Sequence, residues 1–151
     1  MIWLLALLGS LWLSPACDTG LCTCVGPRTP AQALESADAA FTGRVIRMRD
    51  TVFPGEPPNG GWQRRYVTLR VDRSWKGVET RTVTVVTGTG GGDCGFPFEE
   101  GESYLVYARG GPDELETSIC GRTSDLSYAA ADLRALGAPR RTWRAGRAVR
   151  P

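Results

Sequence analysis

The sequence predicts a mainly β protein: one domain whose five strands form a small closed barrel, with a short helix before the strands and another after them. Two observations predict this class. Short segments rich in β-branched and aromatic residues recur between clusters of glycine and proline, which is typical of an all-β domain with tight turns. Helical periodicity is confined to residues 30–36 and 125–136, at the two ends of the patterned region.

The first helix is predicted over residues 30–36. Thr29 and Gln32 have the spacing of a capping box, in which each side chain satisfies a backbone N–H of the other residue. A proline at the first helical position favours the same start, because its missing N–H would have no helical partner there. We expect Ala33 and Leu34 to be buried on this helix.

The strands are predicted from alternation and β-branched content. Residues 66–71 alternate most regularly, with Val67, Leu69 and Val71 directed to the core. Gly43 interrupts the first strand and indicates a β-bulge or a sharp bend. The five predicted strands are residues 40–48, 66–71, 82–87, 104–108 and 115–119.

Glycine and proline define the connections. Residues 50–61 contain three prolines and three glycines and are predicted to form a loop. Residues 88–95 are glycine-rich, and we expect a flexible loop that ends in a disulfide at Cys94. This loop lacks the Gly-Lys-Ser/Thr of a phosphate-binding loop and does not open a helix, so phosphate binding is not expected.

The second helix is predicted over residues 125–136. Its apolar residues fall on one face, and Gly137 occupies the position of a C-cap glycine. Residues 138–151 are predicted to be a disordered, arginine-rich tail, which is solvated or, as the alternative, contacts an anionic surface. Five strands followed by a helix fit a barrel of the OB type.

The N-terminus is typical of an export signal. Residues 2–13 are apolar apart from Gly9 and Ser10, and a run of small residues ends at Ala16, so residues 1–16 are predicted to be a cleaved signal peptide. The apolar stretch is shorter than the about 20 residues that a transmembrane helix needs. We expect an exported protein that is extracellular, periplasmic or anchored to the cell envelope, where disulfides persist.

Cys17 is the odd member of five cysteines. It follows the predicted cleavage site directly, as the lipidated cysteine of a bacterial lipoprotein does. Residues 17–21 are therefore predicted to be an N-terminal extension or a lipid-anchor segment that tethers the domain to a membrane. The alternatives for Cys17 are a free or intermolecularly bridged thiol and another form of processing.

Composition argues against several functions. The chain contains no histidine, the commonest general base and metal ligand, so we expect no enzyme, no cofactor and no metal bound by the isolated domain. Without the five arginines of the last twelve residues, 13 basic residues (18 less five) face 16 acidic ones. The barrel without its tail is therefore mildly acidic, and we expect it to bind no nucleic acid. We also expect a monomer.

Cys22 and Cys24 flank Thr23 in a Cys-x-Cys motif near the start of the domain. A Cys-x-Cys cannot easily close a disulfide on itself. Each cysteine is therefore expected to reach into the body of the fold, which clamps the N-terminal segment twice. Such a segment is either a structural strap or a presented binding edge, and this distinction decides the function.

Short motifs follow one another in a set order along residues 22–137. They are Cys22-Thr23-Cys24, Pro30-Ala31-Gln32-Ala33, Ala37-Asp38, Phe41-Thr42-Gly43-Arg44-Val45, Trp75-Lys76-Gly77, Cys94-Gly95, Tyr-Leu-Val-Tyr-Ala at 104–108 and Thr-Ser-Ile-Cys-Gly-Arg-Thr at 117–123. Their order and spacing resemble the tissue inhibitors of metalloproteinases and the related netrin-like domains (TIMP/NTR). The resemblance implies an OB barrel with the disulfides Cys22–Cys94 and Cys24–Cys120.

The resemblance also implies a function. In that family the mature chain begins at the first cysteine of Cys-x-Cys, and its free α-amino nitrogen and carbonyl oxygen chelate the catalytic zinc of a target protease. Carried over, Cys22 is the chelating residue and Thr23 enters the specificity pocket, with Cys24 and Val25 along the same edge. The implied activity is inhibition of a metalloendopeptidase.

The predicted processing departs from this family pattern. Cleavage after Ala16 leaves residues 17–21 in front of Cys22, so that the nitrogen lies in a peptide bond and has no lone pair to donate. A terminus at Cys22 requires cleavage after Leu21, and signal peptidase prefers a small residue there. The alternative function is a non-inhibitory binding module for an extracellular protein, tethered as a lipoprotein through Cys17.

Overall fold

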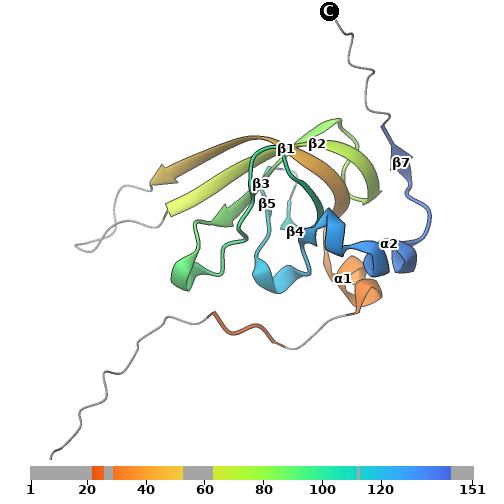
Figure 1. Ribbon diagram of the computed structural model, residues 1–151, viewed down its shortest axis with the longest axis horizontal. Helices are drawn as coiled ribbons and strands as arrows, with labels where there is room; N and C mark the ends of the chain where they lie inside the picture. Colours follow the sequence, from red (N-terminus) through yellow and green to blue (C-terminus); the bar gives the residue numbers. More distant parts are fainter. Residues whose placement is uncertain (1–21, 26–28, 53–62, 112, 144–151) are drawn as a thin grey trace, which may run out of the picture.

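The structure is a computed structural model (Figure 1) that describes residues 22–25, 29–52, 63–111 and 113–143. It is mainly β with two short α-helices, as the sequence predicts. The predicted signal peptide, Cys17 and the extension lie outside the described residues. The elements are α1 (Pro30–Ser36), β1 (Ala39–Val52), β2 (Gln63–Lys76), β3 (Thr82–Gly88), the 3₁₀ turn η1 (Gly91–Asp93), β4 (Ser103–Gly110), β5 (Leu115–Glu116), the 3₁₀ turn η2 (Ile119–Gly121), β6 (Ser124–Asp125), the 3₁₀ turn η3 (Leu126–Tyr128), α2 (Ala130–Leu136) and β7 (Arg141–Thr142).

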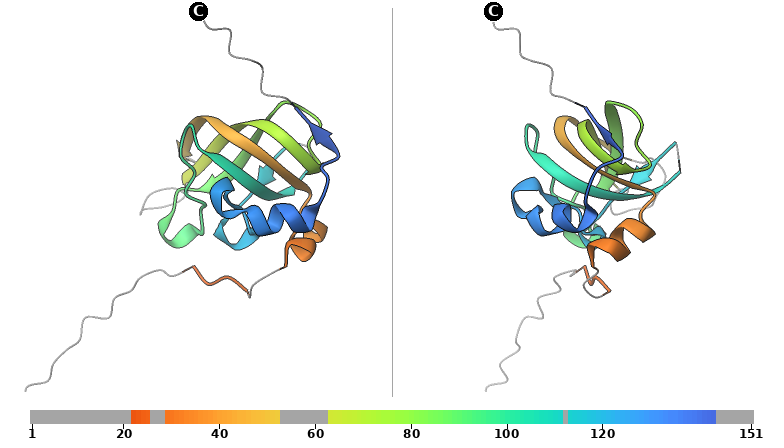
Figure 2. Two further views of the ribbon diagram at one scale, coloured as in Figure 1. Left: turned by 45° about the vertical axis from the view of Figure 1, so that its right-hand side comes forward. Right: turned by 90° about the vertical axis from the view of Figure 1, so that its right-hand side faces the viewer.

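The strands form one sheet whose pairing returns to its start. β1 pairs with β2, β2 with β3, β3 with β5, β5 with β4, and β4 again with β1 (Figure 2). β3 and β5 are parallel, and the other pairs of this ring are antiparallel. β6 adds to β4 and β7 to β2, while the long β1–β2 hairpin extends beyond the rest of the sheet (Figure 1).

The main core fills the inside of the ring. Val67, Leu69 and Val71 of β2 are buried, which confirms the alternation seen in the sequence, and Phe41 and Val45 of β1 lie against them. Each such side chain contributes roughly 1.5–3 kcal/mol by leaving water. The ring is therefore filled with side chains and contains its own hydrophobic core.

A second apolar cluster joins the helices to the outer side of the sheet. Leu105 and Tyr107 of β4 pack there against Ala33 of α1, while their neighbours along β4 belong to the main core. β4 is thus buried on both faces, which explains its uninterrupted apolar sequence. The indole Nε1 of Trp75 donates a hydrogen bond of 3.0 Å to the carbonyl oxygen of Gly137, just after α2. Figure 2 shows α1 and α2 side by side against the sheet.

Local signals in the sequence account for α1 and for the bend of β1. The side chains of Thr29 and Gln32 form both hydrogen bonds of the predicted capping box. The β1–β2 register shifts between Thr42 and Gly43, which confirms the predicted bulge. A Cβ atom at Gly43 would lie 2.9 Å from the carbonyl oxygen of Arg70, so the close approach of the two strands requires glycine.

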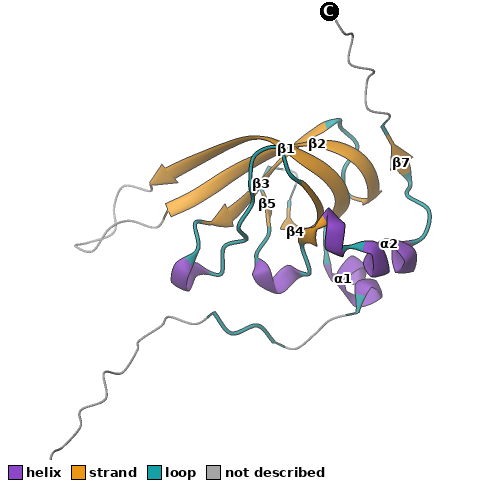
Figure 3. Cartoon of the chain, in the orientation of Figure 1, coloured by secondary structure: helices purple, strands orange, loops and turns teal. Residues whose placement is uncertain are grey.

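The fifth strand is shorter than predicted. Residues 115–119 were expected to be extended, but β5 ends at Glu116 and the chain turns into η2 (Figure 3). The hydroxyl of Thr117 donates to the carbonyl oxygen of Tyr107, and the hydroxyl of Ser118 accepts a hydrogen bond from the N–H of Cys120. The backbone N–H of Thr117 makes the last bond to β3, with the carbonyl oxygen of Val86, and these side-chain bonds then redirect the chain.

The second helix also starts later than predicted. Residues 126–128 form the 3₁₀ turn η3, and α2 begins only at Ala130. The carboxylate of Asp125 accepts hydrogen bonds from the backbone N–H and the hydroxyl of Ser127, which caps the 3₁₀ turn. An aspartate therefore starts the helical region, as the pattern predicts, but its first turn is 3₁₀.

Two loop predictions need correction at their ends. β1 continues to Val52 and β2 begins at Gln63, so residues 50–52 are strand, and Asp50 pairs with Arg65 across the hairpin. The predicted disorder from residue 138 is wrong for residues 141–143, because β7 pairs with β2 and Trp143 lies against the main core. Residues 53–62 and 144–151 lie outside the described part of the chain.

Candidate functional site

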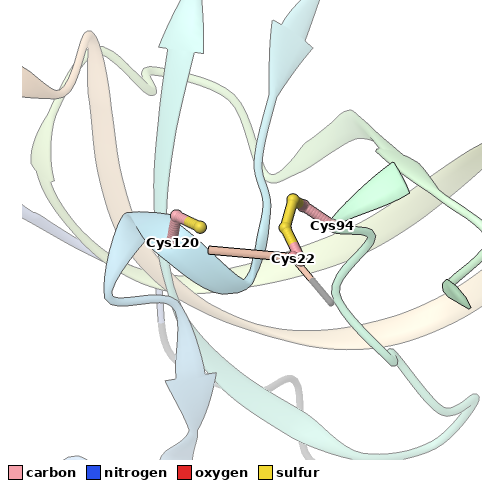
Figure 4. Close-up of side chains that lie close together, drawn as sticks. All are labelled: Cys22, Cys94 and Cys120. Atoms are coloured by element: carbon pink, nitrogen blue, oxygen red, sulfur yellow. A yellow bond between two sulfur atoms is a disulfide. The ribbon is translucent and has the colours of Figure 1, made fainter. Parts of the chain in front are cut away.

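The Cys-x-Cys segment, residues 22–25, lies beside two loops and is called the strap below. Disulfides join Cys22 to Cys94 and Cys24 to Cys120, the pairs that the sequence resemblance implies. The Cα–Cα distances are 5.4 and 5.2 Å, within the usual range for a disulfide. The strap is thus fixed to the loop after β3 and to the loop after β5, and Figure 4 shows the first of these bonds beside Cys120.

The strap presents side chains to solvent. Thr23 is exposed and Val25 is 92% exposed, whereas Cys22 is half-buried. Ile119, the neighbour of Cys120 in the second loop, is also exposed. Among the hydrogen bonds found between described residues, none involves the strap. Its position therefore depends on the two disulfides, and it forms an exposed edge with apolar residues at Val25 and Ile119.

Asp93 shapes the loop that holds Cys94. Its carboxylate accepts hydrogen bonds from the backbone N–H groups of Thr89, Gly90 and Gly95 at 2.8, 3.0 and 2.9 Å. Burial raises the pKa of Asp93, but these N–H groups outweigh burial and hold the pKa below its ordinary value of 3.8. The loop is a compact turn around a carboxylate, which differs from the flexible loop that the glycine content predicts.

The glycines of this loop allow its backbone to pack closely. A Cβ atom at Gly95 would lie 2.3 Å from the carbonyl oxygen of Gly88, and one at Gly88 would overlap the carboxylate of Asp93. Cys94 has a positive φ of 57° between these contacts. Gly88 and Gly95 are therefore required by close contacts within the turn, whereas Gly90 has open space around it and is favoured by its positive φ of 103°. The turn sets the direction of the Cys94 side chain.

The Asp93 network gives a first testable expectation. Asp93→Asn replaces an acceptor-only carboxylate with an amide whose NH₂ group faces backbone donors, so the free energy of unfolding should fall by about 1–2 kcal/mol at pH 7. The folded-state pKa is depressed, so this contribution is fully present above pH 4 and is lost as the pH falls through the folded pKa. Urea unfolding of both proteins at pH 7 and pH 3 measures it, and an equal difference at the two pH values would contradict the assignment.

A buried polar network holds the loop that carries Cys120. The hydroxyls of Thr117 and Thr123 lie 2.7 Å apart and both donate to the carbonyl oxygen of Tyr107. The Tyr107 hydroxyl in turn donates to Asp132 of α2, whose carboxylate also accepts two hydrogen bonds from Arg122. Burial, and then the charge of Asp132, raise the pKa of Tyr107 well above its ordinary value.

This network has no motif in the sequence, although the position of Asp132 is one signal for it. Asp132 lies three residues after Ala129 and four before Leu136, on the apolar face of the predicted helix. A charged residue on a buried face needs a partner, but nothing in the sequence indicates that the partner is Arg122.

A cleft of about 410 Å³ lies between the strap, α1 and β4. Thr23, Cys24 and Val25 form one wall. Arg109 of β4 and Glu116 of β5 lie at its other side as neighbours in the β4–β5 pair. The exposed edge is thus backed by a cavity with apolar and polar walls.

Three of the cysteine sulfurs are close together. The Sγ atoms of Cys22, Cys94 and Cys120 lie within 4.8 Å of one another. In the disulfide form these sulfurs carry no thiolate charge, which a metal ion requires of a cysteine ligand. The three sulfurs belong to two neighbouring disulfides: Cys22 and Cys94 form one of them, and Cys120 forms the other with Cys24.

Glu100, in an acidic stretch before β4, accepts a hydrogen bond of 2.7 Å from the backbone N–H of Met48, which is a structural contact.

None of the described helices is long and apolar enough to cross a membrane. No protein-family model matches the chain, and no curated protein matches its sequence significantly.

Proposed function

We propose that this chain is an exported TIMP/NTR-like domain with an OB-type barrel, and that the strap is its binding edge for a zinc metalloendopeptidase. The observation that carries the proposal is the double fixation of the strap, which leaves Thr23 and Val25 exposed between two disulfides. The ring of five paired strands supports the barrel, because a small closed barrel needs both edges of its sheet to be paired. In this proposal the domain is a ligand of an enzyme and performs no catalysis itself.

Fixation favours a binding role because it lowers the entropic cost of association. A free four-residue segment loses backbone and side-chain freedom when it binds, at about 1–2 kcal/mol for each ordered backbone residue. The disulfides impose that order before any partner arrives, and the compact Asp93 turn and the Tyr107–Asp132 network hold the two loops. More of the contact energy then appears as affinity.

The inhibitory chemistry is that of the family which the chain resembles. The amine and carbonyl oxygen of Cys22 would chelate the protease zinc, and Thr23 would enter the adjacent pocket. Val25 and Ile119 add apolar contact area on the same edge. Chelation requires an unblocked amine at Cys22, and this requirement makes the proposal testable.

The test compares three N-termini of the same disulfide-bonded domain. One form begins at Cys22, a second has this amine acetylated, and a third begins at residue 17. Only the first should inhibit zinc endopeptidases in a peptide-cleavage assay, and the other two should be weaker by at least about 30-fold, the change that follows loss of a 2 kcal/mol contact. Equal inhibition by the acetylated form would exclude chelation by the amine.

A matched pair of substitutions tests the position of the edge. Val25 and Tyr128 are both large, apolar and highly exposed, but only Val25 belongs to the strap. Val25→Ser should weaken inhibition in the form that begins at Cys22, whereas Tyr128→Ser serves as the control and should leave inhibition unchanged. An equal effect of the two substitutions would place the binding surface elsewhere.

A second candidate function follows from the sequence before the strap. Residues 17–21 precede Cys22, and with them attached its nitrogen is part of an amide. The domain would then be a non-inhibitory binding module, tethered through a lipidated Cys17, that presents the same edge to an extracellular protein. The intact mass of the protein from its own host decides: a terminus at Cys17 with added lipid mass supports the module, and a terminus at Cys22 supports the inhibitor.

A further inference from the structure

The two disulfides of the strap are close enough to exchange partners. The Cys120 sulfur lies within 4.8 Å of the sulfurs of Cys22 and Cys94, and Figure 4 shows it on the side that faces their bond. In the oxidised protein Cys120 is bonded to Cys24 and cannot react. Reduction of that bond would place a thiolate beside a second disulfide, which is the arrangement that thiol–disulfide exchange requires.

Exposure decides which sulfur an external reductant reaches first. Cys24 is exposed, whereas Cys22, Cys94 and Cys120 are each partly buried. A thiolate from solvent therefore attacks the Cys24 sulfur, forms a mixed disulfide there and expels Cys120 as a thiolate. The group released by this attack is the one that lies beside the second disulfide.

Cys120 and Cys94 remain close after this step, because their loops are held independently of the strap. The backbone N–H of Ile119 donates to the carbonyl oxygen of Cys94 at 3.1 Å, which joins the two loops directly. Asp93 fixes one loop, and the Thr117–Tyr107 hydrogen bond fixes the other. Between described residues, the two disulfides are the covalent bonds from the strap to these loops and no hydrogen bond adds to them, so the strap separates from the loops when both disulfides have opened.

We propose that a single dithiol molecule releases the strap, through an exchange in which the Cys120 thiolate attacks Cys94 and displaces Cys22 from the Cys22–Cys94 disulfide. In that step a bond forms between the Cys120 and Cys94 sulfurs and the Cys22–Cys94 bond breaks. Its electron pair goes to the Cys22 sulfur, which takes a proton from water. The second thiol of the reductant then resolves the mixed disulfide at Cys24 and leaves as a cyclic disulfide. Two electrons enter the protein, which keeps one disulfide, Cys94–Cys120.

This release is a property of the fold and does not depend on the proposed function. The freed strap no longer presents Thr23 and Val25, and the far side of the cleft, which includes Tyr107 and Thr117, loses its cover. Without the exchange, one dithiol would leave the strap attached through Cys22. The exchange therefore makes the edge responsive to a small amount of reductant.

Partial reduction of the oxidised protein tests the proposal. Cys17→Ser removes the fifth thiol, and this protein is treated with one equivalent of dithiothreitol, quenched with acid, alkylated and mapped by mass spectrometry. The one-disulfide fraction should carry Cys94–Cys120 with both strap cysteines alkylated, in at least about tenfold excess over the other forms. Retention of Cys22–Cys94, formation of Cys22–Cys120, or loss of both disulfides without an intermediate would overturn it.

In the Cys17→Ser protein, two single substitutions form a matched pair for the same test. Cys24→Ser leaves the Cys120 thiol beside Cys22–Cys94 and should convert to Cys94–Cys120 at pH 8 without any reductant. Cys120→Ser leaves only the Cys24 thiol, which does not belong to the three-sulfur group, and should keep Cys22–Cys94. A folded Cys24→Ser protein that keeps Cys22–Cys94 contradicts the proposal; if this variant does not fold, the partial reduction of the parent decides.

Discussion

Replacing both residues of the Cys24–Cys120 disulfide with serine is expected to lower the free energy of unfolding by about 3.5 kcal/mol. The two cysteines are 96 residues apart, but the remaining Cys22–Cys94 bond shortens the loop that this disulfide closes in the unfolded chain. The shorter path runs two residues back to Cys22, crosses the disulfide and continues for 26 residues from Cys94 to Cys120. The effective loop therefore has about 28 residues, and an isolated 96-residue loop would give about 4.7 kcal/mol instead.

Removing both disulfides should have a much larger effect. The second loss restores the full freedom of a loop between residues 72 apart, so the total reaches about 8 kcal/mol, which is comparable to the whole stability of a typical domain. We therefore expect the variant without these four cysteines to be largely unfolded at 37 °C. The variant without Cys24–Cys120 should remain folded, with a Tm lower by roughly 10–20 °C.

Urea unfolding followed by circular dichroism measures these differences. All variants carry Cys17→Ser, so that the fifth thiol is the same in each, and Thr23→Ser is the control because it changes the strap without changing a disulfide. The denatured state expands when a cross-link is lost, so the dependence of the free energy on urea should also become steeper. A Cys24→Ser/Cys120→Ser protein within about 1 kcal/mol of its parent would show that the unfolded chain gains little freedom.

Elements with local causes could be predicted from the sequence. The capping box of Thr29 and Gln32 fixes the start of α1, and the alternation of β2 gives its buried face. Gly43 marks the bulge because only a residue without Cβ fits against Arg70. The first two signals lie within one element. The third is the glycine itself, which interrupts a β-branched strand and is visible in the sequence although the residue that it contacts is distant.

Features that depend on distant partners could not be predicted. β7 forms because Arg141 and Thr142 pair with β2 and Trp143 packs against the main core. The sequence of these residues has no strand or helix periodicity of its own. The end of β5 is decided by Thr117, whose hydroxyl finds the carbonyl oxygen of Tyr107 ten residues earlier. Such contacts exist only after the sheet has formed.

The candidate site shows the same division. The cysteine pairs of the strap follow from a resemblance in motif order, and the structure joins the same pairs. The proximity of Cys120 to the other disulfide has no sequence signal, because it depends on how two loops lie against each other. The role of the Asp93 carboxylate could not be predicted either, because a glycine-rich sequence does not indicate whether the segment is flexible or is ordered around a hydrogen-bond acceptor.

Asp132→Asn is expected to lower the free energy of unfolding by about 2–3 kcal/mol. Asp132 is 7% exposed and accepts hydrogen bonds from Arg122 and from the Tyr107 hydroxyl. The amide removes the negative charge that faces the Arg122 guanidinium, while its size hardly changes, so no cavity contributes. Since the Arg122 side chain is 31% exposed, water compensates part of the loss, and the effect stays below that of a fully buried pair.

A double-mutant cycle separates the ion pair from other effects of the substitution. Arg122→Gln and Asp132→Asn are combined, and the coupling energy should be about 1–2 kcal/mol, because each single change leaves one partner without its opposite charge. Asp113→Asn is the matched control: Asp113 is exposed, and its substitution should leave the Tm unchanged. Additive single effects would mean that the two threonine hydroxyls and the disulfide hold the Cys120 loop without help from α2. A coupling of the expected size would mean that α2 helps to hold the loop that carries Cys120, through the pair between Arg122 and Asp132.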